Sequence, residues 1–316
     1  MINAVKIARH EPDALQTSSE VCLNAPTVEL IGAAMGLGGP DTGAAGGPAV
    51  LHRLGLANVL RSAGHLVRWS PVLLPEVAHA VGGQSQSRLA AVHDFNLRLA
   101  KRVETAVLAN RFPLVLGGDH SIAAGTWAGA ARALSSSGRA PPGLLWIDAH
   151  MDAHTPSTTP TGNPHGMPLA ELLGAYGTGP SLNPQHVALV GVRSYEHAEA
   201  GLLERLGVRV YFADEVARRG LQTVISEALA RVSQAGAYGV TLDIDALDPI
   251  DAPATSTREP GGLRADALIA ALAQLKQYSG LMAAEIVEYN PFLDADRGTA
   301  RLVERLTHIL IAGVRR

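Results

Sequence analysis

The chain has 316 residues, of which 47% are hydrophobic and 17% charged, so it can bury a large core and exceeds the usual size of one domain without requiring two. Its formal net charge of −3 and its lack of a basic run argue against a nucleic-acid partner. The single cysteine, Cys22, excludes an intrachain disulfide and favours a cytoplasmic location, and no apolar stretch approaches the ~20 residues that a membrane span needs.

Apolar runs rich in β-branched residues alternate along the chain with stretches of helical periodicity. The apolar runs predict eight strands, at residues 27–32, 65–70, 113–117, 143–147, 186–192, 208–213, 238–244 and 281–287. The helical stretches predict helices at residues 86–109, 122–134, 196–206, 216–233, 265–277 and 297–311. Strand and helix in regular succession predict one large α/β domain, with a mostly parallel sheet covered by helices on both faces.

Three regions fit neither pattern. The N-terminus is polar and charged throughout and lacks the apolar segment of a secretory signal, so we expect residues 1–26 to form a loose leader, or an arm on a neighbouring subunit, ahead of a folded domain at residues 27–316. Glycine and proline are frequent at residues 36–48 and 155–168, which predicts two long loops. Loops of that length in an ordered domain are usually functional.

Four potential metal ligands follow the fourth predicted strand: Asp148, His150, Asp152 and His154. Because side chains alternate in an extended chain, all four would share one face at a spacing of about 7 Å. Together they would concentrate negative charge and lone pairs that a cation neutralises. The stretch therefore predicts a divalent cation site just past the end of a buried strand.

Two other strand ends carry similar side chains. The third predicted strand leads into Gly117-Gly118-Asp119-His120-Ser121, where two glycines let the backbone pass closely and deliver His120 to the edge of the sheet. The seventh ends in Asp243 and Asp245, two residues apart on one face. Ligands of open α/β sheets bind beyond the carboxyl ends of the strands, so we expect all three stretches to meet there.

The three stretches supply two imidazoles and four carboxylates as metal ligands: His120, Asp148, His150, Asp152, Asp243 and Asp245. This set exceeds what one tetrahedral zinc ion requires and contains no thiolate. Two cations about 3.5–4 Å apart, bridged by carboxylates, fit it better. Oxygen ligands with some imidazole favour Mn²⁺, with Co²⁺, Ni²⁺ or Zn²⁺ as replacements. Such a pair of ions generates a nucleophile from water at neutral pH, so the sequence predicts a hydrolase.

Three segments resemble the signature motifs of the arginase, or ureohydrolase, family: Gly-Gly-Asp-His-Ser at 117–121, Asp-Ala-His-x-Asp at 148–152 and Asp-x-Asp-x-x-Asp-Pro at 243–249. The resemblance extends from residue 27 to the C-terminus and marks residues 27–316 as a catalytic domain. It implies a three-layer α/β/α fold with an eight-stranded mostly parallel sheet, two Mn²⁺ per subunit and a homotrimer or homohexamer. The implied reaction is hydrolysis of a guanidinium group to urea and an amine.

Within the family, two segments resemble arginases more than agmatinases. One is the glycine-rich segment at residues 36–56, and the other is the loop at residues 155–166. The loop is similar to the one that holds the amino acid end of the substrate in arginases. By this resemblance Thr159, Thr161 and Asn163 would bind the α-carboxylate, and the reaction would convert L-arginine to L-ornithine and urea.

The resemblance also implies catalytic roles. His165 matches the proton shuttle, and Glu288 matches the carboxylate that pairs with the guanidinium. Thr257 matches a threonine that lines the metal pocket. From these positions we expect Asp152 to hold the attacking water and to pass a proton to the leaving amine.

The chain departs from the arginase pattern at two positions. His154 stands where arginases commonly have an asparagine that binds the α-carboxylate, and Glu196 stands where they have an aspartate near the α-amino group. An imidazole can also bind a carboxylate, so arginine stays the first predicted substrate. The alternative is a shifted pocket that prefers a shorter or longer guanidino acid. His154 equally fits a partner behind a metal ligand, and Glu196 equally fits a helix cap.

Other functions fit the same motifs less closely. The nearest alternatives are an agmatinase or a guanidinobutyrase, which would use the same chemistry on another small guanidino substrate. A deacylase with one zinc ion is disfavoured, because the carboxylates for a second cation are present. A metal-dependent assembly protein without catalytic activity is disfavoured because all the expected catalytic residues are present.

Overall fold

The computed structural model describes residues 26–76 and 85–314, and its centre is a sheet of eight parallel strands. The strand order is β2-β1-β3-β8-β7-β4-β5-β6. The strands are β1 (Val28–Ala33), β2 (Val67–Leu73), β3 (Phe112–Leu116), β4 (Gly143–Ile147), β5 (Val187–Val192), β6 (Arg209–Phe212), β7 (Tyr238–Asp243) and β8 (Leu281–Val287). The predicted α/β class and all eight predicted strands are confirmed, whereas the predicted leader lies almost wholly outside the described residues.

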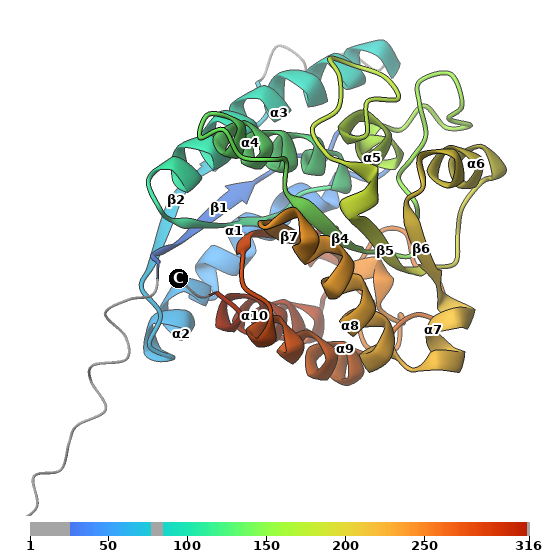
Figure 1. The fold of residues 1–316 in the computed structure, drawn as a ribbon. Coiled ribbons are helices and arrows are strands. Elements are labelled where there is room, and N and C mark those ends of the chain that lie inside the picture. The colour runs from blue at the N-terminus through green and yellow to red at the C-terminus, as the bar shows by residue number, and fades with distance from the viewer. Residues whose placement is uncertain (1–25, 77–84, 315–316) are drawn as a thin grey trace, which may run out of the picture.

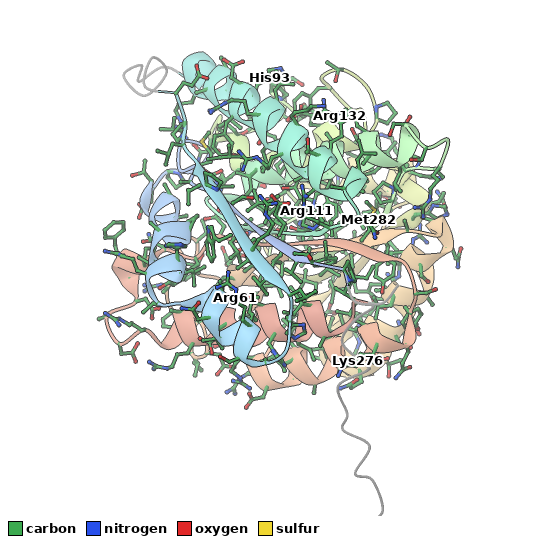
Figure 2. All side chains as sticks on the ribbon, turned by 90° about the vertical axis from the view of Figure 1, so that its left-hand side faces the viewer. Arg61, His93, Arg111, Arg132, Lys276 and Met282 are labelled. Carbon is green, nitrogen blue, oxygen red and sulfur yellow. The ribbon has the colours of Figure 1, made fainter. Side chains whose placement is uncertain are left out.

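Helices cover both faces of this sheet. One layer contains α3 (Ser85–Leu108), α4 (Ala123–Ser135), α5 (Pro168–Leu172) and α6 (His197–Leu206). The other contains α1 (Gly47–Arg53), α2 (Leu56–Ser62), α7 (Ala213–Arg219), α8 (Leu221–Val232), α9 (Ala265–Leu272) and α10 (Gly298–Ala312). Figure 1 shows the first layer above the sheet and the second below it, and Figure 2 shows the same layers from the β2 edge.

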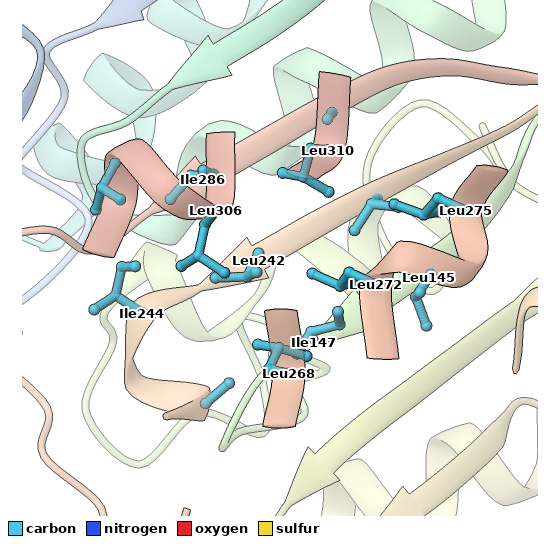
Figure 3. Packing of buried hydrophobic residues seen from close by; sticks show 14 of the residues in the cluster. Leu145, Ile147, Leu242, Ile244, Leu268, Leu272, Leu275, Ile286, Leu306 and Leu310 are labelled. Atoms are coloured by element: carbon cyan, nitrogen blue, oxygen red, sulfur yellow. The ribbon is translucent and has the colours of Figure 1, made fainter. Parts of the chain in front are cut away.

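Each central strand is buried on both faces. In β4, Leu145 and Ile147 belong to the apolar cluster under α8, α9 and α10, while Leu144 and Trp146 belong to the cluster under α3 and α4. Figure 3 shows the first of these clusters, in which side chains of β4, β7 and β8 face those of α9 and α10. A strand with apolar neighbours on both faces requires a continuous apolar run, which is why the strands could be predicted from the sequence.

The helices agree less well with prediction. The single helix predicted at residues 216–233 is wrong, since Gly220 has a φ of +83° and separates α7 from α8. Glycine adopts this left-handed conformation without the strain that a Cβ would impose. The helices α1, α2 and α5 were not predicted because each has seven residues or fewer, too short for a helical period to be recognised.

Gly239 of β7 packs against Trp127 of α4, and a Cβ at this position would lie 2.0 Å from the indole ring. Both residues are buried, so Gly239→Ala should force the ring to move within a packed core. We expect it to lower the free energy of unfolding by about 2 kcal/mol, measured by urea denaturation. As a control, Gly201→Ala in α6 should raise that free energy by roughly 0.5 kcal/mol, because only the end of a flexible arginine approaches there. Equal stability of the two variants would contradict this account.

Candidate metal and active site

Four neighbouring strands end at one site. The strands β3, β8, β7 and β4 lie side by side, and their carboxyl ends lead into His120, Glu288, Asp243 and Asp148 respectively. Because the strands are parallel, residues far apart in the sequence meet at one edge of the sheet. The glycine pair after β3 lets the backbone before His120 pass close to the segment that follows β1. A Cβ on Gly118 would lie 2.0 Å from the carbonyl oxygen of Met35 in that segment.

Three carboxylates converge on one nitrogen of His120. Its Nδ1 lies 3.0 Å from Asp148 Oδ2, 2.9 Å from Asp152 Oδ2 and 3.1 Å from Asp243 Oδ2, and all four side chains are buried. Nδ1 nevertheless has no hydrogen-bond partner within residues 26–76 and 85–314. One nitrogen and three carboxylate oxygens that face a common point form the donor set of a divalent cation site.

The other ring nitrogen of His120 is held by a buried relay. His120 Nε2 lies 3.1 Å from Thr241 Oγ1, and the Thr241 hydroxyl donates to Glu285 at 2.8 Å. Since that hydroxyl proton is used, Thr241 accepts from Nε2–H, which leaves a lone pair on Nδ1 as a metal ligand requires. Thr241 and Glu285 were not predicted from the sequence, although polar residues inside apolar strands were a usable signal.

A second cluster shares Asp148 with the first. His150 Nδ1 lies 3.1 Å from Asp245 Oδ2 and 3.5 Å from Asp148 Oδ1, whereas the other oxygen of Asp148 faces His120. The Thr257 hydroxyl donates to Asp245 Oδ2 at 2.9 Å, so Thr257 lies where the sequence predicts, beside the clusters. Asp148 thus has one oxygen directed to each cluster.

The carboxylates in these clusters repel one another. Burial and the charge of Asp148 raise the pKa of Asp152 to about 6. Burial and the charges of Asp245 and Asp148 also raise the pKa of Asp243. Divalent cations would remove the repulsion and favour the ionised carboxylates. Together with the unpartnered nitrogen of His120, this makes the residues present a good fit for divalent metal ions.

Two acidic residues of the site have left-handed backbones. Asp152 has a φ of +49° and Glu288 a φ of +64°, which is uncommon outside glycine. The extended conformation predicted for residues 148–154, with four side chains on one face, is therefore wrong: the chain bends after Asp148 and turns at Asp152. Asp148, His150 and Asp152 still reach the two clusters, but His154 does not.

Glu288 and His165 lie beside the first cluster. Glu288 Oε1 accepts a hydrogen bond from the backbone N–H of His120 at 3.0 Å and from His165 Nδ1 at 3.2 Å. Burial alone would lower the pKa of His165, but the hydrogen bond and charge of Glu288 outweigh it and raise the pKa to about 9. His165 thus carries a proton at neutral pH. It lies next to a carboxylate whose second oxygen accepts no hydrogen bond from the part of the chain that the structure describes.

Both clusters open into a cavity of about 390 Å³. Besides the clusters, Glu288 and His165, its lining includes a set of residues that we call the polar wall: His154, Thr161, Asn163, Glu196 and Glu199. Thr159 is not part of the lining. Its hydroxyl accepts from the backbone N–H of Gly162 at 3.0 Å and lies 3.5 Å from Thr161 Oγ1, so Thr159 shapes the loop that carries Thr161.

Within the polar wall, His154 contacts two glutamates. His154 Nε2 lies 2.9 Å from Glu196 Oε2 and 3.3 Å from Glu199 Oε2. The two oxygens of Glu199 also accept backbone N–H bonds from Ala153 at 2.9 Å and from Glu196 at 3.0 Å. Burial and the nearby Glu196 raise the pKa of Glu199 to about 8. Glu196 is both the N-cap residue of α6 and part of the cavity lining, so its position suits a helix cap and a substrate contact alike.

Comparison with known proteins identifies the family. The family model described as "Arginase family" matches residues 26–312. The chain belongs to the arginase family. It is 36% identical over 291 residues to the arginase of Bacillus caldovelox, a match that covers 88% of this chain and 96% of the relative. The crystal structure of arginase from Bacillus subtilis has a TM-score of 0.83 at 34% identity and covers 90% of this chain and 98% of its own.

Membership of the arginase family confirms the predicted family and fold and shows that the protein is an enzyme, a hydrolase of the ureohydrolase type. The structure of Entamoeba histolytica arginase in complex with L-ornithine has a TM-score of 0.82 at 26% identity and covers 92% of this chain and 99% of its own. Over residues 26–76 and 85–314, no helix has the length and apolar character needed to cross a membrane.

Removal of divalent metal is expected to destabilise the protein, because the clustered carboxylates would repel one another. Dialysis against a chelator should lower Tm, and added Mn²⁺ should restore it, with about 2.7 kcal/mol of stabilisation per site at a free metal concentration of 100 Kd. Asp148→Asn should abolish most of this response. Asp214→Asn, at an exposed carboxylate paired with Arg218, should keep it. A wild-type Tm unaffected by chelator would refute the metal assignment.

Proposed function

We propose that this protein is an arginase that hydrolyses L-arginine to L-ornithine and urea with two Mn²⁺ ions per subunit. One observation carries the proposal: a single cavity joins two histidine and aspartate clusters, the free carboxylate oxygen of Glu288 and a wall suited to the polar end of an amino acid. The relatives named arginase support the choice of substrate.

At the clusters, His120, Asp148, Asp152 and Asp243 would hold one ion, and Asp148, His150 and Asp245 the other. When bound, the ions would lower the pKa of a water molecule and so supply the nucleophile at neutral pH. A ligand set rich in carboxylate oxygens, with some imidazole and no thiolate, favours Mn²⁺ over zinc. Co²⁺, Ni²⁺ or Zn²⁺ could replace Mn²⁺ at these sites.

The side chains around the clusters handle the substrate and its protons. Glu288 would pair with the planar guanidinium through its free oxygen, since its other oxygen is fixed by His120 and His165. Asp152, with a pKa near neutrality in the absence of metal, would pass a proton to the leaving amine. His165 would exchange protons between the site and solvent.

The polar wall would bind the amino acid end of arginine. Thr161 and Asn163 present donors for the α-carboxylate, Thr159 supports them, and Glu196 presents a carboxylate for the α-ammonium group. His154 would complete the wall through its contact with Glu196. By its family resemblance, the protein would also form a homotrimer or homohexamer, lie in the cytoplasm and have its catalytic domain at residues 27–316.

Urea release tests the proposal. Purified protein loaded with Mn²⁺ should release urea from L-arginine with a kcat/KM at least tenfold above that for agmatine or 4-guanidinobutyrate, since only arginine engages the whole polar wall. Glu288→Gln should lose about 10²-fold in kcat/KM, in line with hydrogen bonds between charged groups, while Glu204→Gln on the exposed face of α6 should lose nothing. Preference for agmatine would assign the chain to the agmatinases, and no urea from any of the three would overturn the reaction.

The His165–Glu288 contact predicts a pH dependence. The pKa of His165, about 9, lies above the ~6.5 of an unperturbed histidine, so the contact stabilises the fold fully below about pH 6.5 and loses its effect as the pH rises through about 9. The stability difference between wild type and His165→Asn, measured by urea denaturation, should therefore shrink from pH 6 to pH 10. The same variant should lose about 10²-fold in kcat. Substitution of the exposed His93 by asparagine serves as the control, and a difference independent of pH would contradict the assignment.

A further inference from the structure

Arg88, in the first turn of α3, joins the two long loops of the site. Its Nε donates to the carbonyl oxygen of Leu37 at 2.9 Å, and its Nη2 donates to the carbonyl oxygen of Gly39 at 2.7 Å. Nη2 also donates to Asn163 Oδ1 at 3.1 Å. One guanidinium therefore ties the loop after β1 to the loop that carries part of the polar wall.

The contact with Arg88 determines which way the Asn163 amide points. A guanidinium has only donors, so the atom of Asn163 that faces Arg88 must be the amide oxygen. The amide NH₂ is then directed away from Arg88, and no hydrogen-bond partner for it lies among residues 26–76 and 85–314. Because Asn163 lines the cavity, this NH₂ is a donor available to a bound ligand.

The positive charge of Arg88 strengthens that donor. Within the described part of the chain, its three hydrogen bonds all go to neutral oxygens, two backbone carbonyls and one amide. A hydrogen bond from a cation to the amide oxygen polarises the amide and makes its N–H groups better donors. Glu196, a carboxylate of the polar wall whose pKa is lowered by its hydrogen bonds to Glu199 and His154, would repel a substrate carboxylate, so an oriented and polarised donor matters here.

We propose that Arg88 is a positioning residue that fixes and polarises the Asn163 amide and thereby makes the enzyme select guanidino substrates that carry a carboxylate. This inference rests on the proposed function. Arg88 does not need to touch the substrate, because it acts through Asn163. Lysine would not replace it, since an ammonium on a flexible stem cannot reproduce the planar fork that holds both loops.

Ligand pairs that differ only in the carboxylate test the inference. Titration calorimetry of the Mn²⁺-loaded protein should show wild type binding L-ornithine more tightly than putrescine, which has the same amines and chain but no carboxylate. In Arg88→Met the affinity for ornithine should fall about tenfold, the loss expected for one hydrogen bond to a charged group, while the affinity for putrescine changes less than twofold. In turnover assays, KM for arginine should rise by a similar factor with kcat nearly unchanged.

Matched variants separate positioning from general stability. Arg98→Met removes another arginine of α3, which donates to the carbonyl oxygen of Leu74, and should leave both affinities unchanged. Arg88→Lys should resemble Arg88→Met if it folds with a wild-type Tm. Asn163→Ala combined with Arg88→Met should be no worse than Asn163→Ala alone, because both changes remove the same donor.

Two results would overturn the inference. One is a ratio of ornithine to putrescine affinity that is the same in wild type and in both Arg88 variants. The other is a wild type that binds ornithine no more tightly than putrescine. Failure of the proposed function is recognised separately, as the absence of urea release by wild type from arginine, agmatine and 4-guanidinobutyrate, and calorimetry does not depend on turnover.

Discussion

The structure depends on bringing several buried carboxylates close together without letting their repulsion open the fold. Asp148, Asp152, Asp243 and Asp245 all lie at the ends of neighbouring strands, and each is less than one-tenth exposed. Carboxylates this crowded are unfavourable unless cations and hydrogen bonds compensate them. The surrounding polar contacts serve that purpose: Trp146 donates to Asp148 at 2.8 Å, backbone N–H groups donate to Asp148 and Asp243, and the Thr257 hydroxyl donates to Asp245.

The rigid sheet also sustains local backbone strain. Left-handed conformations at Asp152 and Glu288 cost of order 1–3 kcal/mol each for residues with a Cβ. Backbone hydrogen bonds hold both turns in place, from Leu169 N–H to the carbonyl of Asp152 at 2.9 Å and from Glu288 N–H to the carbonyl of Gly118 at 2.9 Å. The strained residues are those whose side chains must point into the cavity directly after, or close to, the end of a strand.

Much of this arrangement could be predicted from the sequence, because strands buried on both faces are continuous apolar runs and parallel strands end on one side of the sheet. The local backbone geometry of the site could not be predicted in this way. Alternation along residues 148–154 predicts one shared face, yet the turn at Asp152 places His154 with Glu196 instead. Contacts between distant residues also escaped prediction, since no local pattern relates Arg88 to Asn163, which is 75 positions away.

Glu199 limits how the substrate specificity of such an enzyme can change. One oxygen of its carboxylate accepts a hydrogen bond from the backbone N–H of Ala153, next to the proposed metal ligand Asp152. The other accepts from the backbone N–H of Glu196, the N-cap residue of α6. Glu199 therefore connects the segment that would bind the amino acid end of the substrate to the segment that would act on its guanidinium group. As long as Glu199 connects the two segments, changes to α6 that accommodate a different substrate will also move the backbone beside Asp152.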